Sequence, residues 1–176
     1  MFRNRAASLF TALLLYGFLT ACAVPTGETI LPDSAFTTVE IAGLGVDPES
    51  RSPIVLLREP GTERVVPIWI GISEAEAIAR AMEGIETPRP MTHDLLASTV
   101  AGLGARVEEV VILEQRDGIY YGVIRLATGA RGRRVEIDSR PSDGLALAVR
   151  TGATIRVARA LFMESPDERP QPRPTA

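Results

Sequence analysis

The polar side chains of this chain that suit catalysis gather in two short segments, residues 89–96 and 140–145. Each segment places an Arg-Pro pair shortly before an acidic residue that opens an apolar helical pattern. Proline is tolerated in the first helical turn, and an early aspartate complements the helix dipole, so both segments are typical of helix starts. The first segment holds the only histidine of the chain, His93. We expect the two helix starts to face each other and to form one polar cleft.

These residue types are the ones that metal-assisted phosphodiester hydrolysis uses. The reaction needs oxygen ligands for Mg2+ or Mn2+, a group that orients the attacking water, and positive charge near the phosphate. A guanidinium fork matches the geometry of a phosphate. The candidates are Asp138, Asp143, His93 and Asp94 as catalytic residues, Asp138, Asp143 and Glu74 as metal ligands, and Arg89, Arg140 and Ser142 as phosphate-binding or substrate-binding residues.

Most of these candidates also have a structural interpretation. Ser73 and Glu76 have the spacing of a capping box, in which the first caps a helix and the second lies three residues on. Thr92 can cap the next helix, where Asp94 would complement the dipole. Asp143 falls in the first turn after a proline and has the same interpretation. The arginines would then pair with these carboxylates, and exposed pairs of this kind contribute little to stability.

Asp138 is the most informative of the carboxylates. It ends an alternating strand beside the turn that leads into a helix, where a side chain can be presented to a cleft. A role in the turn itself is the alternative. If the site is real, His93, Asp138 and Asp143 share one pocket. Tyr120 and Tyr121 point to opposite faces of a strand, so at most one of them can stack on a base.

The N-terminal residues 1–22 have the pattern of an export signal. Arg3 and Arg5 precede an apolar run that ends at the sequence Leu-Thr-Ala-Cys, and the run is shorter than a membrane-spanning helix requires. These last residues resemble the lipobox of bacterial lipoproteins, which implies that Cys22 is lipidated. Because Ala23 follows the cysteine, the protein is expected in the periplasm, on an outer membrane if the host has one. A plain signal peptide with an incidental cysteine is the alternative.

The rest of the chain divides into a tether, one folded domain and a tail. Residues 23–35 are polar and prone to turns, whereas residues 164–176 are rich in proline and charge and are predicted to be disordered. Residues 36–163 have the length of a single domain. In that domain, alternation predicts strands at 36–46, 54–58, 65–70, 105–115, 119–127, 133–138 and 154–158, and helical spacing predicts helices at 73–84, 92–103 and 141–151.

This order of elements predicts an α+β fold with a mixed sheet of six to seven strands and three main helices. Composition and missing motifs restrict the function further. The chain carries 19 basic and 22 acidic side chains, so its overall field does not favour a polyanion. It has no phosphate loop, dinucleotide fingerprint, zincin motif, paired cysteines or serine-hydrolase elbow, which leaves those chemistries without support.

Five short segments, at 67–71, 74–78, 88–96, 117–121 and 138–143, together resemble the bifunctional nuclease family, a small bacterial and plant domain. The resemblance spans about residues 36–163. It implies nuclease activity on DNA and RNA, as reported for plant members, and hence a nucleic-acid partner. The chain departs from the usual pattern at Ser139 and Gly144, where alanine is commoner in the family.

Two functions follow from these observations. The first is a membrane-anchored, metal-dependent phosphodiesterase centred on the two Arg-Pro segments. The second is a non-catalytic binding or assembly module at the cell envelope, a homo-oligomer in which the same segments only hold helices in place. The excess of acidic over basic side chains and the capping interpretations favour the binding or assembly module. The family resemblance favours the phosphodiesterase.

Overall fold

A computed structural model describes residues 32–129 and 132–162. The predicted export signal, Cys22, nearly all of the tether and the C-terminal tail lie outside the described residues. Among the helices that are described, none has the length and hydrophobicity that crossing a membrane requires.

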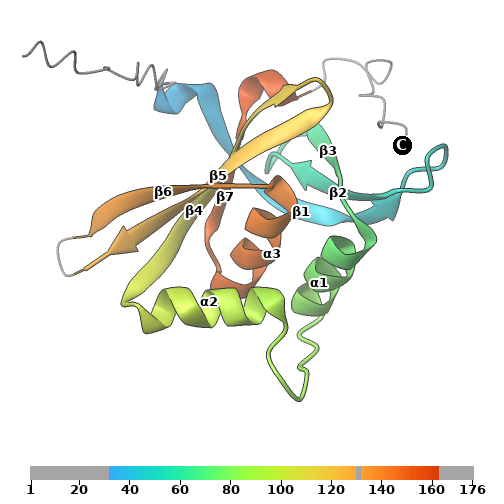
Figure 1. Ribbon diagram of the computed structural model, residues 1–176. Helices are drawn as coiled ribbons and strands as arrows, with labels where there is room; N and C mark the ends of the chain where they lie inside the picture. Colours follow the sequence, from blue (N-terminus) through green and yellow to red (C-terminus); the bar gives the residue numbers. More distant parts are fainter. Residues whose placement is uncertain (1–31, 130–131, 163–176) are drawn as a thin grey trace, which may run out of the picture. The chain divides into compact units, whose positions relative to one another are not determined.

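Seven strands form one mixed sheet in the order β3-β2-β1-β7-β4-β5-β6 (Figure 1). All neighbouring strands are antiparallel except β4 and β7, which run parallel. The α+β prediction is therefore confirmed, including the mixed strand direction near the end of the domain. The strands are β1 (Phe36–Val46), β2 (Pro53–Arg58), β3 (Val65–Trp69), β4 (Ala105–Arg116), β5 (Ile119–Thr128), β6 (Arg133–Ser139) and β7 (Thr154–Ala158).

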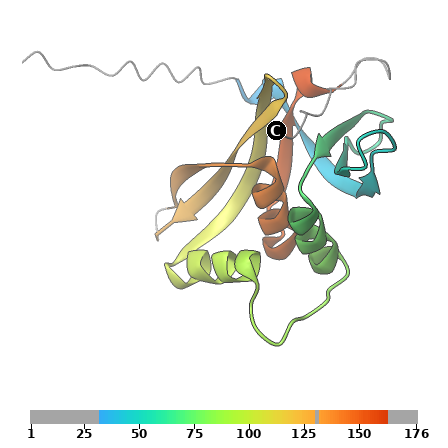
Figure 2. The same ribbon diagram turned by 45° about the vertical axis from the view of Figure 1, so that its right-hand side comes forward.

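Three helices, α1 (Ile72–Met82), α2 (Thr92–Gly102) and α3 (Pro141–Thr151), lie on one side of the sheet (Figure 2). The central helix is α3, which contacts β4 and β5 and has α1 and α2 as neighbours. Short 3-10 turns precede β1 and follow β7, at η1 (Asp33–Ala35) and η2 (Arg159–Leu161).

The helices and the sheet enclose the main hydrophobic core. In α3, Leu145 and Leu147 are fully buried, and burial of one such side chain contributes about 1.5–3 kcal/mol. The helix approaches β4 closely at Gly144, where an added Cβ would lie 2.6 Å from Cγ1 of Val110. The glycine therefore permits close packing that the methyl group of an alanine would obstruct.

The two faces of the sheet differ, because successive side chains of a strand point to opposite sides. On β5, Ile124 belongs to the core under the helices. Its neighbour Val123 instead packs with Phe36 and Val111 in a smaller cluster on the other face. Each residue of β6 can therefore be assigned to a face from its partner on β5.

Two helix starts differ from the predictions. The N-cap of α1 is Gly71 and not Ser73, and Glu76 lies on the exposed surface beside Arg80, so the predicted capping box is wrong. The N-cap of α2 is Met91 and not Thr92, and its N–H donates to the Asp94 carboxylate over 2.9 Å. The predicted role of that aspartate at the helix start is confirmed. The hairpin turn is also confirmed, with Asp117 and Gly118 both at positive φ.

Candidate functional site

The starts of all three helices meet in one cluster of polar side chains, which we call the helix-start cluster: His93, Asp143, Arg140 and Glu74. His93 Nε2 lies 3.2 Å from Asp143 Oδ1. The guanidinium of Arg140 donates to both oxygens of Asp143, from Nε over 2.8 Å and from Nη2 over 3.0 Å. The same Nη2 donates to Glu74 Oε1 over 2.8 Å. The two Arg-Pro segments therefore face each other, as predicted.

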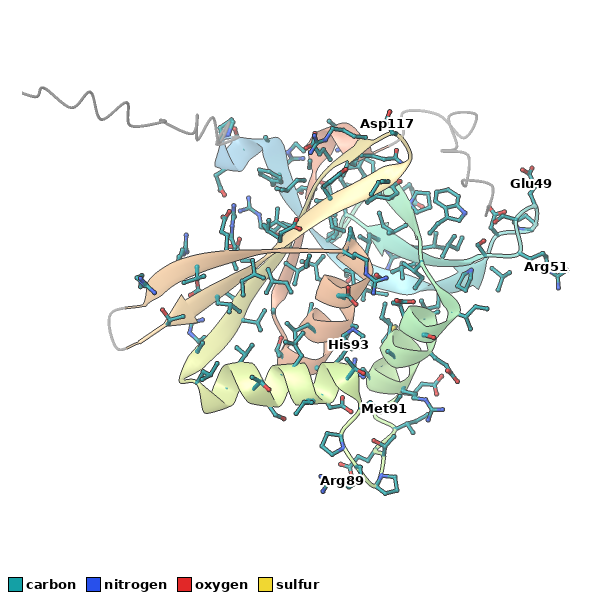
Figure 3. The ribbon with its side chains drawn as sticks, viewed as in Figure 1. Glu49, Arg51, Arg89, Met91, His93 and Asp117 are labelled. Atoms are coloured by element: carbon teal, nitrogen blue, oxygen red, sulfur yellow. The ribbon has the colours of Figure 1, made fainter. Side chains whose placement is uncertain are left out.

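Local sequence explains why these side chains converge. Asp143 lies in the first turn of α3, behind a proline that occupies the start of the helix. Glu74 lies in the first turn of α1, and its carboxylate folds back over Gly71, where an added Cβ would be only 2.2 Å from Oε2. Any larger residue at that N-cap would therefore displace the carboxylate. His93 follows the first residue of α2 and stands at the end of α2 that adjoins the other helices (Figure 3).

Electrostatics keep the carboxylate of Asp143 ionised. Partial burial raises its pKa, but the hydrogen bonds from Arg140 and His93 outweigh burial and hold the pKa below its ordinary value. The same contacts raise the pKa of Arg140, with the hydrogen bond to Asp143 as the largest cause. Because an ionised carboxylate only accepts hydrogen bonds, Nε2 of His93 must be the donor, and Nδ1 is the acceptor in the neutral ring.

The helix-start cluster presents a cation to solvent. The Arg140 side chain is 67% exposed, whereas that of His93 is 12% exposed. Among the described residues, none accepts a hydrogen bond from Nη1 of Arg140 or bonds Nδ1 of His93. One amino group and one ring nitrogen therefore remain available to a ligand. An anion could approach the guanidinium beside a group that transfers protons.

Asp94 belongs to a separate contact. Its carboxylate accepts from Arg150 Nε over 2.5 Å, and Arg150 also donates to the carbonyls of Ala146 and Ala77. The Arg150 side chain is only 10% exposed, and its contacts tie α3 to both neighbouring helices. Asp94 and Arg150 also line a pocket of about 470 Å³ beside the loop between α1 and α2. Asp94 thus holds the helices and does not join the helix-start cluster.

Asp138 is not brought to the helix-start cluster. It pairs with Val123 of β5, whose side chain packs on the sheet face opposite the helices. Its neighbour Ser139 takes the helix side, where its Oγ lies 3.6 Å from the Cβ that Gly144 would carry. The prediction that Asp138 shares a pocket with His93 and Asp143 is therefore wrong. The reason is the alternation of side chains along β6, which directs Ser139 and not Asp138 toward α3.

Two of the predicted phosphate contacts lie outside the helix-start cluster. Arg89 is exposed at the tip of the loop before α2 and points away from His93 (Figure 3). Ser142 is buried in the first turn of α3 and is not presented to solvent. Of the three predicted contacts, Arg140 alone stands in the cluster.

The tyrosines divide between the faces of β5 as predicted. Tyr120 packs against the core and donates to the carbonyl of Pro67, and burial raises its pKa to about 12. The ring of Tyr121 lies under the guanidinium of Arg116, 4.4 Å from its centroid. Tyr120 is thereby committed to packing, and Tyr121 to a cation–π contact.

The carboxylates of the helix-start cluster, as they are arranged, do not fit a divalent cation. Glu74 and Asp143 both point at the guanidinium of Arg140, which occupies the space between the two carboxylates. Within residues 32–129 and 132–162, no three acidic, histidine or cysteine side chains are placed to hold a metal ion together. A cation could enter only if the guanidinium moved away, because both would need the same oxygens.

Arg150 is the site residue that the sequence predictions missed. The sequence does contain a signal for it, because Arg150 is the only charged side chain among residues 144–151, which are otherwise almost entirely apolar. A lone arginine in a buried helix needs partners, and Asp94 with two carbonyls supplies them.

Known proteins resemble this chain over most of its length. The family model of the bifunctional nuclease domain matches residues 55–168. An uncharacterised protein of Mycobacterium tuberculosis is 38% identical over 142 residues, which cover 78% of this chain and 84% of that protein. Bifunctional nuclease 1 of Oryza sativa subsp. japonica is 28% identical over 123 residues, 69% of this chain and 37% of the plant protein. Bifunctional nuclease 2 of Arabidopsis thaliana is 29% identical over 111 residues, 62% and 34% of the two chains. This chain thus spans about a third of the plant nucleases, and it belongs to the bifunctional nuclease domain family.

Proposed function

We propose that the chain is a membrane-anchored phosphodiesterase that cleaves nucleic acid at the helix-start cluster. One observation carries the proposal: the only histidine of the chain is held by an ionised aspartate, beside a guanidinium whose Nη1 has no acceptor in the part of the chain that the structure describes. Membership in the bifunctional nuclease family supports the reaction class, and plant relatives bear the name of nucleases. Their further sequence is not shared with this chain, so the substrate is part of the proposal.

Each member of the helix-start cluster has a role in this reaction. Nη1 of Arg140 contacts a non-bridging phosphate oxygen, because a guanidinium fits phosphate and remains charged. Asp143 accepts the Nε2 hydrogen of His93 and so fixes the ring, which leaves Nδ1 facing the reacting group. His93 takes a proton from the attacking water or gives one to the leaving oxygen. Glu74 holds Arg140 in place from α1.

The Mg2+ or Mn2+ requirement predicted from the sequence stays a prediction. No step of the proposed reaction passes through a metal, since Arg140 occupies the space between the carboxylates. We therefore design the cleavage assay with three arms, Mg2+, Mn2+ and EDTA. Cleavage in EDTA would assign the reaction to the side chains alone.

The experiment compares cleavage of single-stranded DNA and RNA by the full-length protein and by two matched variants. We expect Asp143→Asn to cleave at least about tenfold more slowly than wild type, because the amide no longer anchors Arg140 and His93 as a charge. Asp138→Asn removes a carboxylate on the other sheet face and should cleave at the wild-type rate. Equal cleavage by all three proteins would point to a contaminating nuclease and remove the site assignment.

Membrane anchoring is part of the same proposal. It is supported by the export pattern of residues 1–22 and the lipobox-like end at Cys22. We expect Cys22→Ala to move the protein from the membrane fraction to the soluble envelope fraction, as measured by fractionation and immunoblotting. Metabolic labelling with a clickable fatty acid should mark the wild type and not the variant. Labelling of both, or of neither, would contradict lipidation at this cysteine.

A second candidate function is a non-catalytic assembly module. The observation that favours it is α2, which has no buried residue and exposes apolar side chains such as Leu95 and Leu96. Leu103, directly after the helix, is 79% exposed. Exposed apolar surface of this kind is common at protein interfaces. If purified wild type fails to cleave nucleic acid under all three conditions, this function replaces the first.

A further inference from the structure

We propose that two copies of the chain associate through the outer edge of β6 and continue the sheet across the dimer. β6 is the last strand of the sheet, and among residues 32–129 and 132–162 only β5 pairs with it (Figure 1). A strand edge offers unpaired backbone donors and acceptors to a second strand. The proposal gives the predicted self-association a specific surface, and it does not depend on nuclease activity.

The two edges of the sheet differ in how open they are. The other edge strand, β3, has five residues and contains Pro67, which has no N–H to offer. β6 has seven residues and no proline. Natural proteins commonly protect edges by short strands and prolines. β6 lacks both protections and is the edge that accepts a partner.

The backbone of β6 is oriented for this pairing. The carbonyl of Arg133 accepts a hydrogen bond from the Thr128 hydroxyl over 3.1 Å, which turns it toward β5. In an antiparallel ladder, alternate residues point their N–H and C=O to opposite sides. Arg134, Glu136 and Asp138 therefore offer their backbone groups outward, where a second strand would lie.

Side-chain charge selects a second copy as the occupant. A two-fold axis at Glu136 places Arg134 of each copy opposite Asp138 of the other. The same axis places Val135 opposite Ile137, which is 45% exposed in the single chain. Opposite charges and apolar pairs directly across strands are both stabilising. Asp138 has no ion pair among the described residues, so the second copy supplies its cation.

Neighbouring registers are less favourable. An axis at Ile137 would place Glu136 opposite Asp138, which brings like charges together. An axis at Val135 would place Arg134 opposite Glu136, whose carboxylate Arg125 already holds, and it would place Asp138 opposite Gly132, which offers no cation. The axis at Glu136 does bring two glutamates together, but in each copy Arg125 Nε holds the Glu136 carboxylate over 2.7 Å.

Disulfide trapping tests the register in the full-length protein, with Cys22→Ala in the background so that no other thiol is present. Glu136→Cys stands at the proposed axis, and its two copies would lie within disulfide reach. We expect a covalent dimer after mild oxidation of the purified protein. Glu63→Cys, an exposed glutamate before β3, is the matched control and should stay monomeric. Equal trapping at both positions would overturn the proposal.

Charge reversal tests the partner. Asp138→Arg should raise the dimer dissociation constant about tenfold or more, since each cross-strand ion pair becomes a repulsion. The double variant Arg134→Asp with Asp138→Arg restores opposite charges and should restore the dimer. Light scattering of the purified Cys22→Ala protein over a range of concentrations gives the dissociation constants. A monomeric parent protein, an unaffected Asp138→Arg variant, or a double variant no better than the single one would each contradict pairing at β6.

Discussion

Replacing His93 with glutamine should lower the rate of nucleic-acid cleavage by about 10²–10⁴-fold, the range that a general acid or base contributes. Glutamine can still donate its amide hydrogen to Asp143, so the contact that His93 Nε2 makes at 3.2 Å has a substitute. Its amide cannot accept or release a proton near neutral pH. The loss would therefore report proton transfer and not the loss of a helix contact. Single-turnover cleavage of an end-labelled RNA measures the rate constant.

Two controls accompany this variant. The unfolding midpoint of His93→Gln in urea should stay close to that of wild type, because the contact with Asp143 is kept. The salt dependence of RNA binding should also be unchanged, since Arg140 is untouched. Cleavage by His93→Gln within twofold of wild type would remove His93 from the reaction.

The largest effect on stability is expected for Arg150→Met. Methionine keeps much of the apolar stem, but it leaves Oδ1 of Asp94 and the carbonyl of Ala77 without their donor. Loss of one partner from a largely buried, hydrogen-bonded pair typically costs several kcal/mol, and the partial exposure of Asp94 reduces that cost. We expect the free energy of unfolding to fall by about 2–4 kcal/mol. Urea unfolding followed by circular dichroism gives the value.

Arg58→Met is the matched control for that variant. Arg58 pairs with Glu40 in the same way at 2.7 Å, but both side chains are about half exposed. Exposed pairs contribute about 1 kcal/mol at most, so the control should be nearly neutral. Similar losses for the two variants would show that burial of Arg150 does not matter.

The contact between Arg150 and Asp94 should also make the stability of the protein depend on pH in the acid range. The hydrogen bond from Arg150, followed by that from the Met91 N–H, lowers the pKa of Asp94 below its ordinary value of 3.8. A carboxylate with a lowered pKa in the folded state stabilises the protein above its ordinary pKa and loses that contribution as the pH falls through the lowered value. Wild type should therefore lose stability below about pH 4. Arg150→Met should lose less stability over the same pH range. Without Arg150, the pKa of Asp94 in the folded protein lies closer to its pKa in the unfolded chain.

The sequence predicted most of the fold because its elements have clear periods. The strands of the hairpin alternate cleanly, and the Asp117-Gly118 turn requires positive φ at both residues. The convergence of His93 and Asp143 was also predictable, since each lies in a helix start where an Arg-Pro pair precedes titratable side chains.

The failures at Asp138 and at the start of α1 have a common physical cause, because each depended on a position being right to within one or two residues. Asp138 and Ser139 are neighbours at the end of β6, and the register with β5 alone decides which of them faces α3. Glu74 and Glu76 are similarly close, and the start of α1 at Ile72 makes the first of them part of the helix-start cluster. Helix boundaries and strand parity are set by tertiary packing, which local patterns do not contain.

The most direct test of the helix-start cluster is the ratio of two single-turnover rate constants, measured for Asp138→Asn and Asp143→Asn on the same RNA. Both variants convert one aspartate to its amide, and they differ in the sheet face on which that residue lies. We predict that Asp138→Asn cleaves at least about tenfold faster than Asp143→Asn, because only Asp143 anchors His93 and Arg140. A ratio near one, or a slower Asp138→Asn variant, would contradict cleavage at this site.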